Sequence, residues 1–544
     1  MSNARSQVGD SSKPDLPNGF LIHSALEYHA QHTPNHPALS LSGNAMSYSE
    51  LNCAANQLAH TLIEHQAEEH ARVGIFLFKS FELAIGIYGA LKAGCIFVPL
   101  DPFMPIERLA FILDDCDIKH IIVDDITADK LTSIHTAKPL HVYGTENDPQ
   151  HSQYAWSTLE SQSTDNPGLI MNDQSLAYIM YTSGSTGSPK GMMHSHLGSI
   201  TYARWGAEHV DLTPIDRVAS HAPLHFDLSI FDFFSTARVG ATVVLVPESV
   251  VRFPASWVQT LESEKITVVF TVPYTLMTMY RDGAMDKRDL TSLRWVLFGG
   301  EPYPPAQLRE LMNKLPHTQF TNVYGPAEAP SCTCHDITVA DVQSDDPLPI
   351  GLLSRNSSGI VIDENGEDVP TGTAGELCIR STTLTHGYWK QPELSKKAFL
   401  TRKDFGYFDT IYFRTGDRVV QHEDGLLRFL GRVDRMVKTR GHRVELDEVE
   451  AALSGHPKVA EAAAFVVVDE LQSQLIMAAV TLKSQLTSDS KQLLPYIKEK
   501  LPVYALPVQI YVREELPHTS TGKIDRRVLS AAYSPTTTGD ENPD

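Results

Sequence analysis

The sequence predicts an α/β protein with two domains: a large N-terminal domain of parallel-rich sheets flanked by helices, and a small α+β C-terminal domain. The length of 544 residues, 42% of them hydrophobic, exceeds what a single hydrophobic core supports. Short apolar strands such as 73–78 and 243–246 alternate with helical stretches such as 81–93 and 306–314. This alternation is typical of βαβ units around largely parallel sheets.

A change in amino-acid composition predicts a domain boundary at Asp434. Residues 429–453 are charged and punctuated by glycine, and they lead into a smaller region of α+β pattern. The two ends of the chain are polar and are expected to be disordered. We therefore expect four regions: a disordered N-terminus (1–16), a core domain (17–433), a small domain (434–532) and a disordered tail (533–544).

Charge and composition exclude several classes of protein. The chain has 45 basic and 66 acidic residues and a net charge of −21, which argues against nucleic acid as a partner. No apolar run approaches the ~20 residues of a membrane span, and the N-terminus lacks the apolar core of a signal peptide. Six scattered cysteines indicate reduced thiols and a cytoplasmic location. The spacing Cys332-x-Cys334-His335 is too tight for a zinc site, and no second pair follows.

A glycine- and hydroxyl-rich loop, "YTSGSTGSPKG" (181–191), follows an apolar strand over 176–180. Glycines let the backbone approach a bulky anion, and successive N–H groups form an anion-binding concavity. We expect Lys190 to add a mobile positive charge, and a helix from His196 to add further free N–H groups nearby. The spacing is not that of a Walker A loop. This segment alone predicts a surface linker as readily as a triphosphate-binding loop.

Two further segments place carboxylates beside tight turns. "NVYGPAE" (322–328) holds Tyr324 and Glu328 around a Gly-Pro turn, and a carboxylate near a nucleotide is a natural magnesium ligand. "FRTGD" (413–417) ends in Asp417, which could accept both hydroxyls of a ribose. Two later polar segments supply charged residues: Arg432, Asp434 and Lys438 in 431–445, and Lys523 in 519–526.

Taken in this order, the segments resemble the adenylate-forming superfamily, and most of all the free-standing amino-acid-activating adenylation enzymes of nonribosomal peptide synthesis. The match begins at "MSYSELN" (46–52) and "LKAGCIFVPLDP" (91–102) and ends at "TGKIDR" (521–526). The resemblance implies a ligase that joins a carboxylic acid to ATP with Mg2+, and releases pyrophosphate. It then passes the acyl group to the phosphopantetheine thiol of a separate carrier protein. It also implies an AMP-binding core and a mobile small domain that carries a catalytic lysine.

The resemblance also implies roles for individual residues. The triphosphate loop would comprise Thr182, Ser183, Gly184, Ser185, Thr186, Gly187 and Lys190. ATP or AMP would further contact Gly300, Glu301, Asn322, Val323, Tyr324, Gly325, Asp417, Phe429 and Arg432, with Tyr324 stacked on adenine and Asp417 and Arg432 at the ribose. The catalytic residues would be Lys523, His225 and Glu328, of which Glu328 ligates the metal. Asp434 would be the hinge, and Gly441 would line the thiol tunnel.

One position departs from the family pattern. Ala327 stands in "GPAE" where the family usually has threonine, so a hydroxyl that would contact the α-phosphate is missing. A single neutral hydrogen bond contributes about 0.5–1.5 kcal/mol, so the substitution should weaken adenylation without abolishing it.

The segment "HFDLSIFD" (225–232) bears on which acid is activated. A carboxylate in an apolar segment needs a cationic partner, and the resemblance implies that Asp227 binds the α-ammonium group of an amino acid. The remaining pocket positions are apolar or uncharged, which should reject a charged side chain. These positions are Leu228, Phe231, Phe270, Leu297, Gly299, Val323, Ser331 and Cys332. A small neutral amino acid is therefore expected. The Asp-Leu-Phe start, Leu297 and Cys332 resemble proline-activating stand-alone enzymes, whereas Phe270, Gly299 and Ser331 are less typical of them. This resemblance puts L-proline first, with alanine or another small neutral amino acid close behind.

Several alternatives remain. A D-alanine:carrier protein ligase shares the "FDLS" start of the pocket segment. An acyl- or aryl-CoA ligase is less consistent with the sequence, because its substrate has no ammonium group for Asp227. A nucleotide-binding regulator would need Lys523 or Glu328 to be missing, and both are present. Only 21 residues follow Lys523, with no carrier-protein serine motif among them, and no condensation domain precedes residue 20, so we expect a free-standing ligase.

Overall fold

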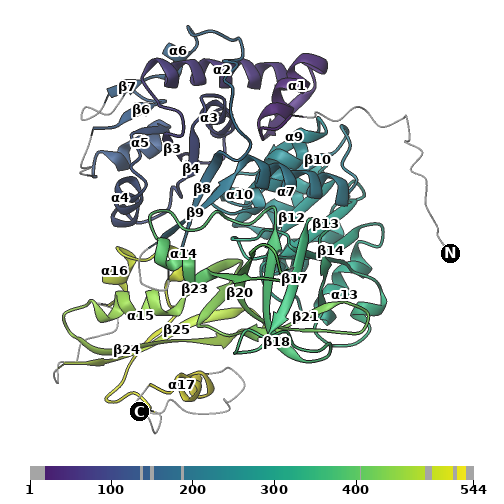
Figure 1. Cartoon of the computed structure of the whole chain (residues 1–544), viewed down its shortest axis with the longest axis vertical. Helices are drawn as coiled ribbons and strands as arrows, with labels where there is room; N and C mark the ends of the chain where they lie inside the picture. Colours follow the sequence, from purple (N-terminus) through teal and green to yellow (C-terminus); the bar gives the residue numbers. More distant parts are fainter. Residues whose placement is uncertain are drawn as a thin grey trace.

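The computed structural model of the chain describes residues 19–134, 139–146, 152–184, 189–404, 406–483, 493–518 and 524–533. Within these ranges the strands form a large sheet of 14 strands, a sheet of seven strands, a three-stranded sheet and a two-stranded hairpin. The first two belong to the N-terminal part of the chain, and the other two form a smaller C-terminal unit beneath it (Figure 1). Among these residues, no helix is long and apolar enough to cross a membrane.

The seven-stranded sheet is parallel except at one edge, where β8 and β9 form an antiparallel pair. Thr182 at the end of β8 pairs with Lys190 at the start of β9, so the glycine-rich loop joins these two strands. In spatial order the strands are β7 (Ser152–Tyr154), β6 (His141–Tyr143), β5 (His120–Val123), β3 (Arg72–Phe76), β4 (Ile96–Pro99), β8 (Leu176–Thr182) and β9 (Lys190–Ser195).

The 14-stranded sheet has a parallel half and an antiparallel half. The parallel half runs from β1 to β14, apart from the edge strand β2: β2 (Asn44–Ser47), β1 (Pro37–Leu41), β11 (Thr242–Leu245), β10 (Arg217–Ser220), β12 (Val268–Thr271), β13 (Trp295–Gly299) and β14 (Gln319–Tyr324). The antiparallel half continues with β15 (Thr333–Asp336), β16 (Pro349–Leu353), β21 (Leu427–Arg432), β20 (Thr410–Gln421), β18 (Ala374–Ser381) and β17 (Ser357–Ile362), while β19 (Phe399–Arg402) pairs with β20.

The C-terminal unit begins with the hairpin of β22 (Met436–Thr439) and β23 (His442–Glu445). Its sheet has β24 (Val459–Val468), β25 (Gln474–Leu482) and β26 (Ile510–Val512). One face of this sheet packs with α15 (Leu446–Ser454) and α16 (Leu493–Lys498), and the other packs with α17 (Arg526–Tyr533). Figure 1 shows α15 on the side that faces the large domain and α17 below the sheet.

The helices of the large domain follow the strands of its two sheets in the chain. The longer ones are α1 (Ser24–His32), α2 (Tyr48–Glu64), α3 (Phe81–Lys92), α4 (Ile106–Asp115), α5 (Asp125–Leu131), α7 (His196–His209), α11 (Pro254–Ser263), α12 (Pro273–Asp282), α13 (Pro305–Lys314) and α14 (Pro392–Ala398). The short ones are α6 (Trp156–Leu159), α8 (Leu228–Ile230), α9 (Thr236–Arg238) and α10 (Glu248–Val251).

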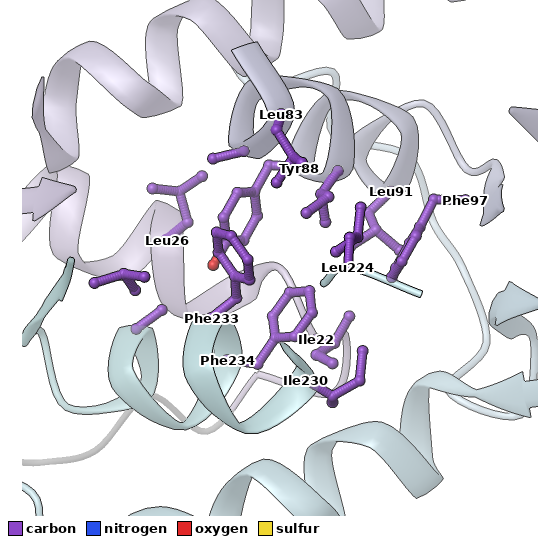
Figure 2. Close-up of a cluster of buried hydrophobic side chains, with 14 of the residues drawn as sticks. Ile22, Leu26, Leu83, Tyr88, Leu91, Phe97, Leu224, Ile230, Phe233 and Phe234 are labelled. Atoms are coloured by element: carbon purple, nitrogen blue, oxygen red, sulfur yellow. The ribbon is translucent and has the colours of Figure 1, made fainter. Parts of the chain in front are cut away.

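A π-helical turn, η1 (Phe231–Ser235), follows the Asp227 segment and anchors it to the core. Phe233 and Phe234 of this turn are buried, and Phe234 meets Tyr88 of α3 edge-on with ring centroids 5.6 Å apart. Figure 2 shows these rings between α3 and the π-turn, among aliphatic side chains such as Leu26. Burial of an aromatic side chain contributes roughly 1.5–3 kcal/mol, so this cluster fixes the segment that precedes it.

The predicted fold class is confirmed. The expected strands at 73–78 and 243–246 and the expected helices at 81–93 and 306–314 are all present, with shifts of one to two residues at their ends. The helix at His196 is present too, but its expected place beside the loop is wrong. Because β9 runs antiparallel to β8, α7 begins beside Leu176, at the end of β8 remote from the loop. Its first turn is capped by the Ser195 side chain.

Candidate functional site

A cavity lies where the glycine-rich loop, the carboxyl ends of β13 and β14, the Asp227 segment and the β22–β23 hairpin meet. The carboxyl ends of parallel strands are the usual place for a ligand site in such sheets. The predicted site residues that line it are Thr182, Ser183, His225, Asp227, Leu228, Phe270, Gly299, Gly300, Val323, Gly325, Ser331, Asp417, Arg432 and Gly441. The cavity is therefore built largely from residues that the sequence had marked.

Glu328 lies behind the cavity wall as a fully buried carboxylate with three partners. Tyr388 Oη donates a hydrogen bond to Oε1 at 2.7 Å. Arg443 Nη1 donates to both oxygens, at 2.8 and 3.0 Å. Lys190 Nζ lies 3.5 Å from Oε1. These cations outweigh the effect of burial and hold the pKa of Glu328 well below its ordinary value.

Lys190 is not mobile, contrary to the expectation from the sequence. It is 6% exposed, and its ammonium group lies 3.3 Å from the Tyr388 hydroxyl and over the Tyr388 ring. Burial lowers its pKa, while Glu328 acts in the opposite direction. The first residue of β9 is therefore a buried cation held against Tyr388 and Glu328.

The described part of the glycine-rich loop touches the small domain. Ser183 Oγ donates a hydrogen bond to the Arg443 carbonyl oxygen at 2.9 Å. Gly184 is buried at the start of the loop. The predicted residues Ser185, Thr186 and Gly187 lie outside the described residues.

The predicted ribose site forms a connected polar network. Asp417 is 1% exposed; it accepts a hydrogen bond from Tyr324 Oη at 2.6 Å and is paired with Arg432. Arg432 also donates two hydrogen bonds to the Asp434 carboxylate, both at 2.6 Å. Asp434 therefore lies between two sheets, with its side chain tied to the large domain. The predicted nucleotide residue Phe429 packs against the hydrophobic cluster of the antiparallel half-sheet and does not line the cavity.

The other predicted nucleotide residues lie just behind the cavity. Asn322 Nδ2 donates to the Pro349 carbonyl oxygen at 2.8 Å, so its side chain ties β14 to β16. Glu301 accepts from the N–H groups of Tyr274 at 3.0 Å and Gly441 at 3.4 Å. Burial raises the Glu301 pKa to about 7.

The predicted substrate residues divide into a lining and a backing layer. Asp227, Leu228, Phe270, Gly299, Val323 and Ser331 line the cavity. Phe231, Leu297 and Cys332 are fully buried behind it, and the Phe231 ring meets that of Phe270 edge-on at 5.4 Å. A Cβ atom on Gly299 would lie 2.2 Å from the Val323 carbonyl oxygen, so glycine is required where β13 and β14 pair.

Asp227 has an environment unlike that of Glu328. No cationic group among the described residues comes within ion-pair distance of its carboxylate. Burial raises its pKa to about 6, and Lys438 opposes this effect from a distance. A carboxylate in this state is ready to bind a cationic ligand.

Five residues of the β22–β23 hairpin line the cavity: Met436, Lys438, Gly441, His442 and Arg443. Gly441 has φ +82°, and a Cβ atom there would lie 2.7 Å from Val272, so a larger residue would push the hairpin away. The Lys438 ammonium group lies over the Tyr324 ring, 5.8 Å from its centroid. Tyr324 is the residue predicted to stack on adenine, and in this arrangement one face of its ring lies next to Lys438.

A second cavity opens between the two domains and shares His225, His442 and Tyr504 with the first. The His442 and Tyr504 rings stack at 4.0 Å. His225 Nε2 lies 4.0 Å from the Asp101 carboxylate, and burial lowers the His225 pKa. Burial lowers the His442 pKa to about 3, and both imidazoles line the two cavities.

Lys523 lies outside the described residues, but its neighbours in the chain are placed. Ile524 packs with α17 on the lower face of the small-domain sheet, and Arg526 binds Glu450 at 2.7 and 2.8 Å. The α15 side of this domain faces the large domain, because Glu448 of α15 pairs with Arg108 of α4 at 2.8 Å. The hairpin therefore lines the cavity in this arrangement, while Ile524 lies on the face of the small-domain sheet that packs with α17.

The donor set near Glu328 fits a metal held mostly by phosphates. In the described part of the chain, no group of three or more His, Cys, Asp or Glu side chains could enclose a metal, and this includes the Cys332–His335 segment. Magnesium is usually held by one or two carboxylates together with substrate phosphates. A single buried carboxylate next to a phosphate-type loop matches that pattern.

Comparison with known proteins gives the family. The description "AMP-binding enzyme" matches residues 26–389, and "AMP-binding enzyme C-terminal domain" matches residues 448–523. The chain belongs to the AMP-binding enzyme family. The family resemblance predicted from the sequence is thus confirmed, and with it the expectation of an enzyme.

Individual relatives cover almost the whole of this AMP-binding enzyme. An L-proline--[L-prolyl-carrier protein] ligase from Pseudomonas fluorescens is 32% identical over 94% of this chain and 99% of that protein. Two linear gramicidin synthase proteins from Brevibacillus parabrevis are each 34% identical over 95% and 96% of this chain, which spans only 10% and 6% of their lengths. The adenylation domain AlmE of Vibrio cholerae, solved with glycyl-adenosine-5'-phosphate, superposes with a TM-score of 0.80 at 24% identity, covering 94% of this chain and 96% of that one. It has the same fold.

Sequence reasoning missed several residues that line the cavity. Tyr202 and Met180 come from a helix and a strand without a motif, and only packing brings them to the cavity. Arg443 and His442 lie within the basic segment 431–445, but no spacing rule predicts that Arg443 would reach Glu328, 115 residues earlier.

Proposed function

We propose that this enzyme activates a small neutral amino acid with ATP, forming aminoacyl-AMP and pyrophosphate, and transfers the aminoacyl group to the phosphopantetheine thiol of a separate carrier protein. The Asp227 carboxylate carries this proposal. It faces the cavity without a protein cation within ion-pair distance among the described residues, and burial raises its pKa to about 6. An amino acid brings the missing ammonium group, whereas a fatty or aryl acid does not.

The remaining groups of the site suit the first half-reaction. Thr182, Ser183, Gly184 and the loop residues after them would hold the β- and γ-phosphates, beside the buried cation of Lys190. Asp417 and Arg432 would hold the ribose. Glu328 would hold Mg2+, which when bound neutralises charge on the phosphates. Lys523 would reach the substrate carboxylate after the small domain turns about Asp434.

The arrangement of the domains suits the second half-reaction. The β22–β23 hairpin closes the cavity, and the second cavity leads from the domain junction to His225 and His442. A pantetheine arm could enter there and present its thiol beside Gly441, where a side chain would collide with Val272. We propose that this is the thiol-transfer arrangement and that Asp434 is the pivot between the two arrangements.

L-proline is the first choice of substrate. The lining residues Leu228, Phe270 and Val323 are apolar, and Tyr202 closes the cavity near Ser331, which leaves room for a compact side chain. A relative of matching length is named for proline. Alanine, including D-alanine, is the second candidate, since the same wall would accept a smaller neutral group.

Pyrophosphate exchange against a panel of amino acids tests the activity, followed by loading of purified phosphopantetheinylated carrier proteins. We expect exchange with L-proline or a small neutral amino acid, and none with aspartate, lysine or benzoate. Strong exchange with an aryl or fatty acid that lacks an amino group would contradict the amino-acid assignment. Pyrophosphate exchange without loading of any carrier protein would support the proposed adenylation step and contradict the proposed transfer step.

A further inference from the structure

Arg443 links the two halves of the site in a way that the assigned roles do not explain. It belongs to β23 of the small domain, yet its guanidinium group binds both oxygens of the buried Glu328 carboxylate in the large domain. Its carbonyl oxygen accepts the hydrogen bond from Ser183 Oγ in the phosphate-type loop. One residue of the small domain therefore contacts both Glu328, the proposed metal ligand, and Ser183 of the glycine-rich loop.

These contacts are strong by the criteria of geometry and burial. Glu328 is fully buried, and the Arg443 side chain is 19% exposed. A charge-assisted pair at 2.8 Å in a buried site is among the stronger protein interactions, and a buried carboxylate that loses its cation is costly. The pair therefore stabilises the arrangement in which the hairpin closes the cavity.

In this arrangement the Glu328 carboxylate is already fully engaged by the protein. Both Glu328 oxygens are engaged by Arg443, and Tyr388 and Lys190 contact Oε1 as well. A divalent cation at Glu328 would have to displace the guanidinium group, because Arg443 covers both carboxylate oxygens and a further double positive charge would lie at short range from Arg443 and Lys190. Phosphates in the loop would likewise compete with the backbone of β23 for Ser183.

We infer that Arg443 is a positioning residue that takes the place of the metal on Glu328, so that the thiol-transfer arrangement can form only after metal and pyrophosphate have left. The inference rests on the proposed function for the meaning of the two arrangements. In this inference, the replacement of the metal by Arg443 on Glu328 determines that the domains rearrange after pyrophosphate release and not before it. The hinge supplies the rotation, and Arg443 supplies the condition for it.

Because the two binding events compete, removal of a side chain from the site should tighten nucleotide binding and not weaken it. If closure and metal-nucleotide binding compete for Glu328, removal of the Arg443 cation must favour the nucleotide-bound arrangement. The Arg443→Met variant should then bind Mg2+·ATP at least fivefold more tightly than the wild type, as measured by calorimetry without amino acid or carrier. A residue with a merely structural role would weaken binding or leave it unchanged.

Chemical crosslinking reports the arrangement itself. Lys500 Nζ of the small domain lies 3.5 Å from Glu107 of α4, and both side chains are partly exposed. In the Glu107→Cys/Lys500→Cys protein, a short bismaleimide should crosslink the domains, and Mg2+ with pyrophosphate should lower the crosslinked fraction. The two single-cysteine variants give the background from native thiols. An unchanged crosslinked fraction on addition of Mg2+ and pyrophosphate would overturn the inference.

The arginine variants sharpen this result. Added to the crosslinking pair, Arg443→Met should lower the crosslinked fraction without any ligand and remove the response to pyrophosphate, and Arg443→Lys should restore part of both. Arg435→Met is the matched control, because Arg435 pairs with Glu450 inside the small domain. Wild-type crosslinking in the Arg443→Met protein, or weaker Mg2+·ATP binding, would refute the exchange. None of these measurements uses an amino acid. A failure of this inference can therefore be distinguished from a failure of the amino-acid assignment, which the exchange panel tests.

Discussion

Glu328 and Asp227 are carboxylates of the same site, but the protein treats them in opposite ways. Glu328 is surrounded by Arg443, Lys190 and Tyr388, and its pKa is held well below the ordinary value. Asp227 has no described cation within ion-pair distance, and burial raises its pKa to about 6. The first charge is compensated by the protein in this arrangement, whereas the second is left for a ligand.

This difference indicates what each carboxylate is for. A charge that the protein neutralises contributes to stability and to the position of the domains. A charge that the protein leaves uncompensated weakens the empty fold and favours a complementary substrate, because the ligand then supplies the missing interaction. Substitutions that exchange carboxylate for amide should therefore separate the two roles.

The largest expected effect is on the free energy of unfolding of Glu328→Gln. Loss of this charge leaves Arg443 and Lys190 buried without their counter-ion, and breaking a buried pair from one side costs about 3–5 kcal/mol. The matched Asp227→Asn variant should be unchanged or more stable at about pH 7.5, because its charge is uncompensated there. Urea denaturation of both variants measures the contrast, and equal destabilisation by the two amides would contradict it.

The second effect is on catalysis by Asp227→Asn. Loss of the carboxylate leaves a substrate ammonium group without its counter-ion, and truncating one side of a buried charged pair costs roughly 2–5 kcal/mol. We expect kcat/KM for the amino acid in pyrophosphate exchange to fall at least thirtyfold, as about 2 kcal/mol corresponds to that factor. The KM for ATP should stay near the wild-type value. A similar rise in the KM for the amino acid and in the KM for ATP would argue for a general loss of structure.

How far the sequence predicts this contrast depends on the kind of residue. Asp227, Glu328 and Asp417 were predictable because each stands in a short motif whose turn or strand end is encoded locally. The charge states of Asp227 and Glu328 were not predictable, since they depend on burial and on partners distant in the chain, such as Arg443 and Tyr388 for Glu328. Lys190 shows the limit: composition predicts a mobile lysine in a loop, but the pairing of β8 and β9 buries it against Tyr388.

The fold was predicted at the level of βαβ alternation, and errors arose where strand direction mattered. Nothing in 181–196 states that the strand after the loop runs back along β8, so the helix at His196 was placed at the wrong end. Tyr202 has no motif at all, and it is part of the site only because α7 packs beside the substrate segment.

The pH dependence should follow the same contrast with a smaller effect. In the free enzyme Asp227 titrates at about pH 6, and only its ionised form binds an ammonium group. The value of kcat/KM for the amino acid should therefore fall about tenfold per pH unit below about pH 6. Glu328 stays ionised over that range because its pKa is lowered, so kcat/KM for ATP should not show this fall. A profile for the amino acid that is flat from about pH 5 to about pH 8 would contradict the Asp227 assignment.

The smallest effect concerns Ala327, which lines the cavity, precedes Glu328 in the chain and lacks the hydroxyl usual in the family. Ala327→Thr would restore a hydrogen-bond donor for the α-phosphate, and one such bond contributes about 0.5–1.5 kcal/mol. Adenylation should then speed up about twofold to tenfold in pyrophosphate exchange. Ala327→Val is the matched control, because it has the shape of threonine without the hydroxyl. If valine raised the rate as much as threonine, the gain would come from packing beside Glu328, and the missing hydroxyl would have no part in the reaction.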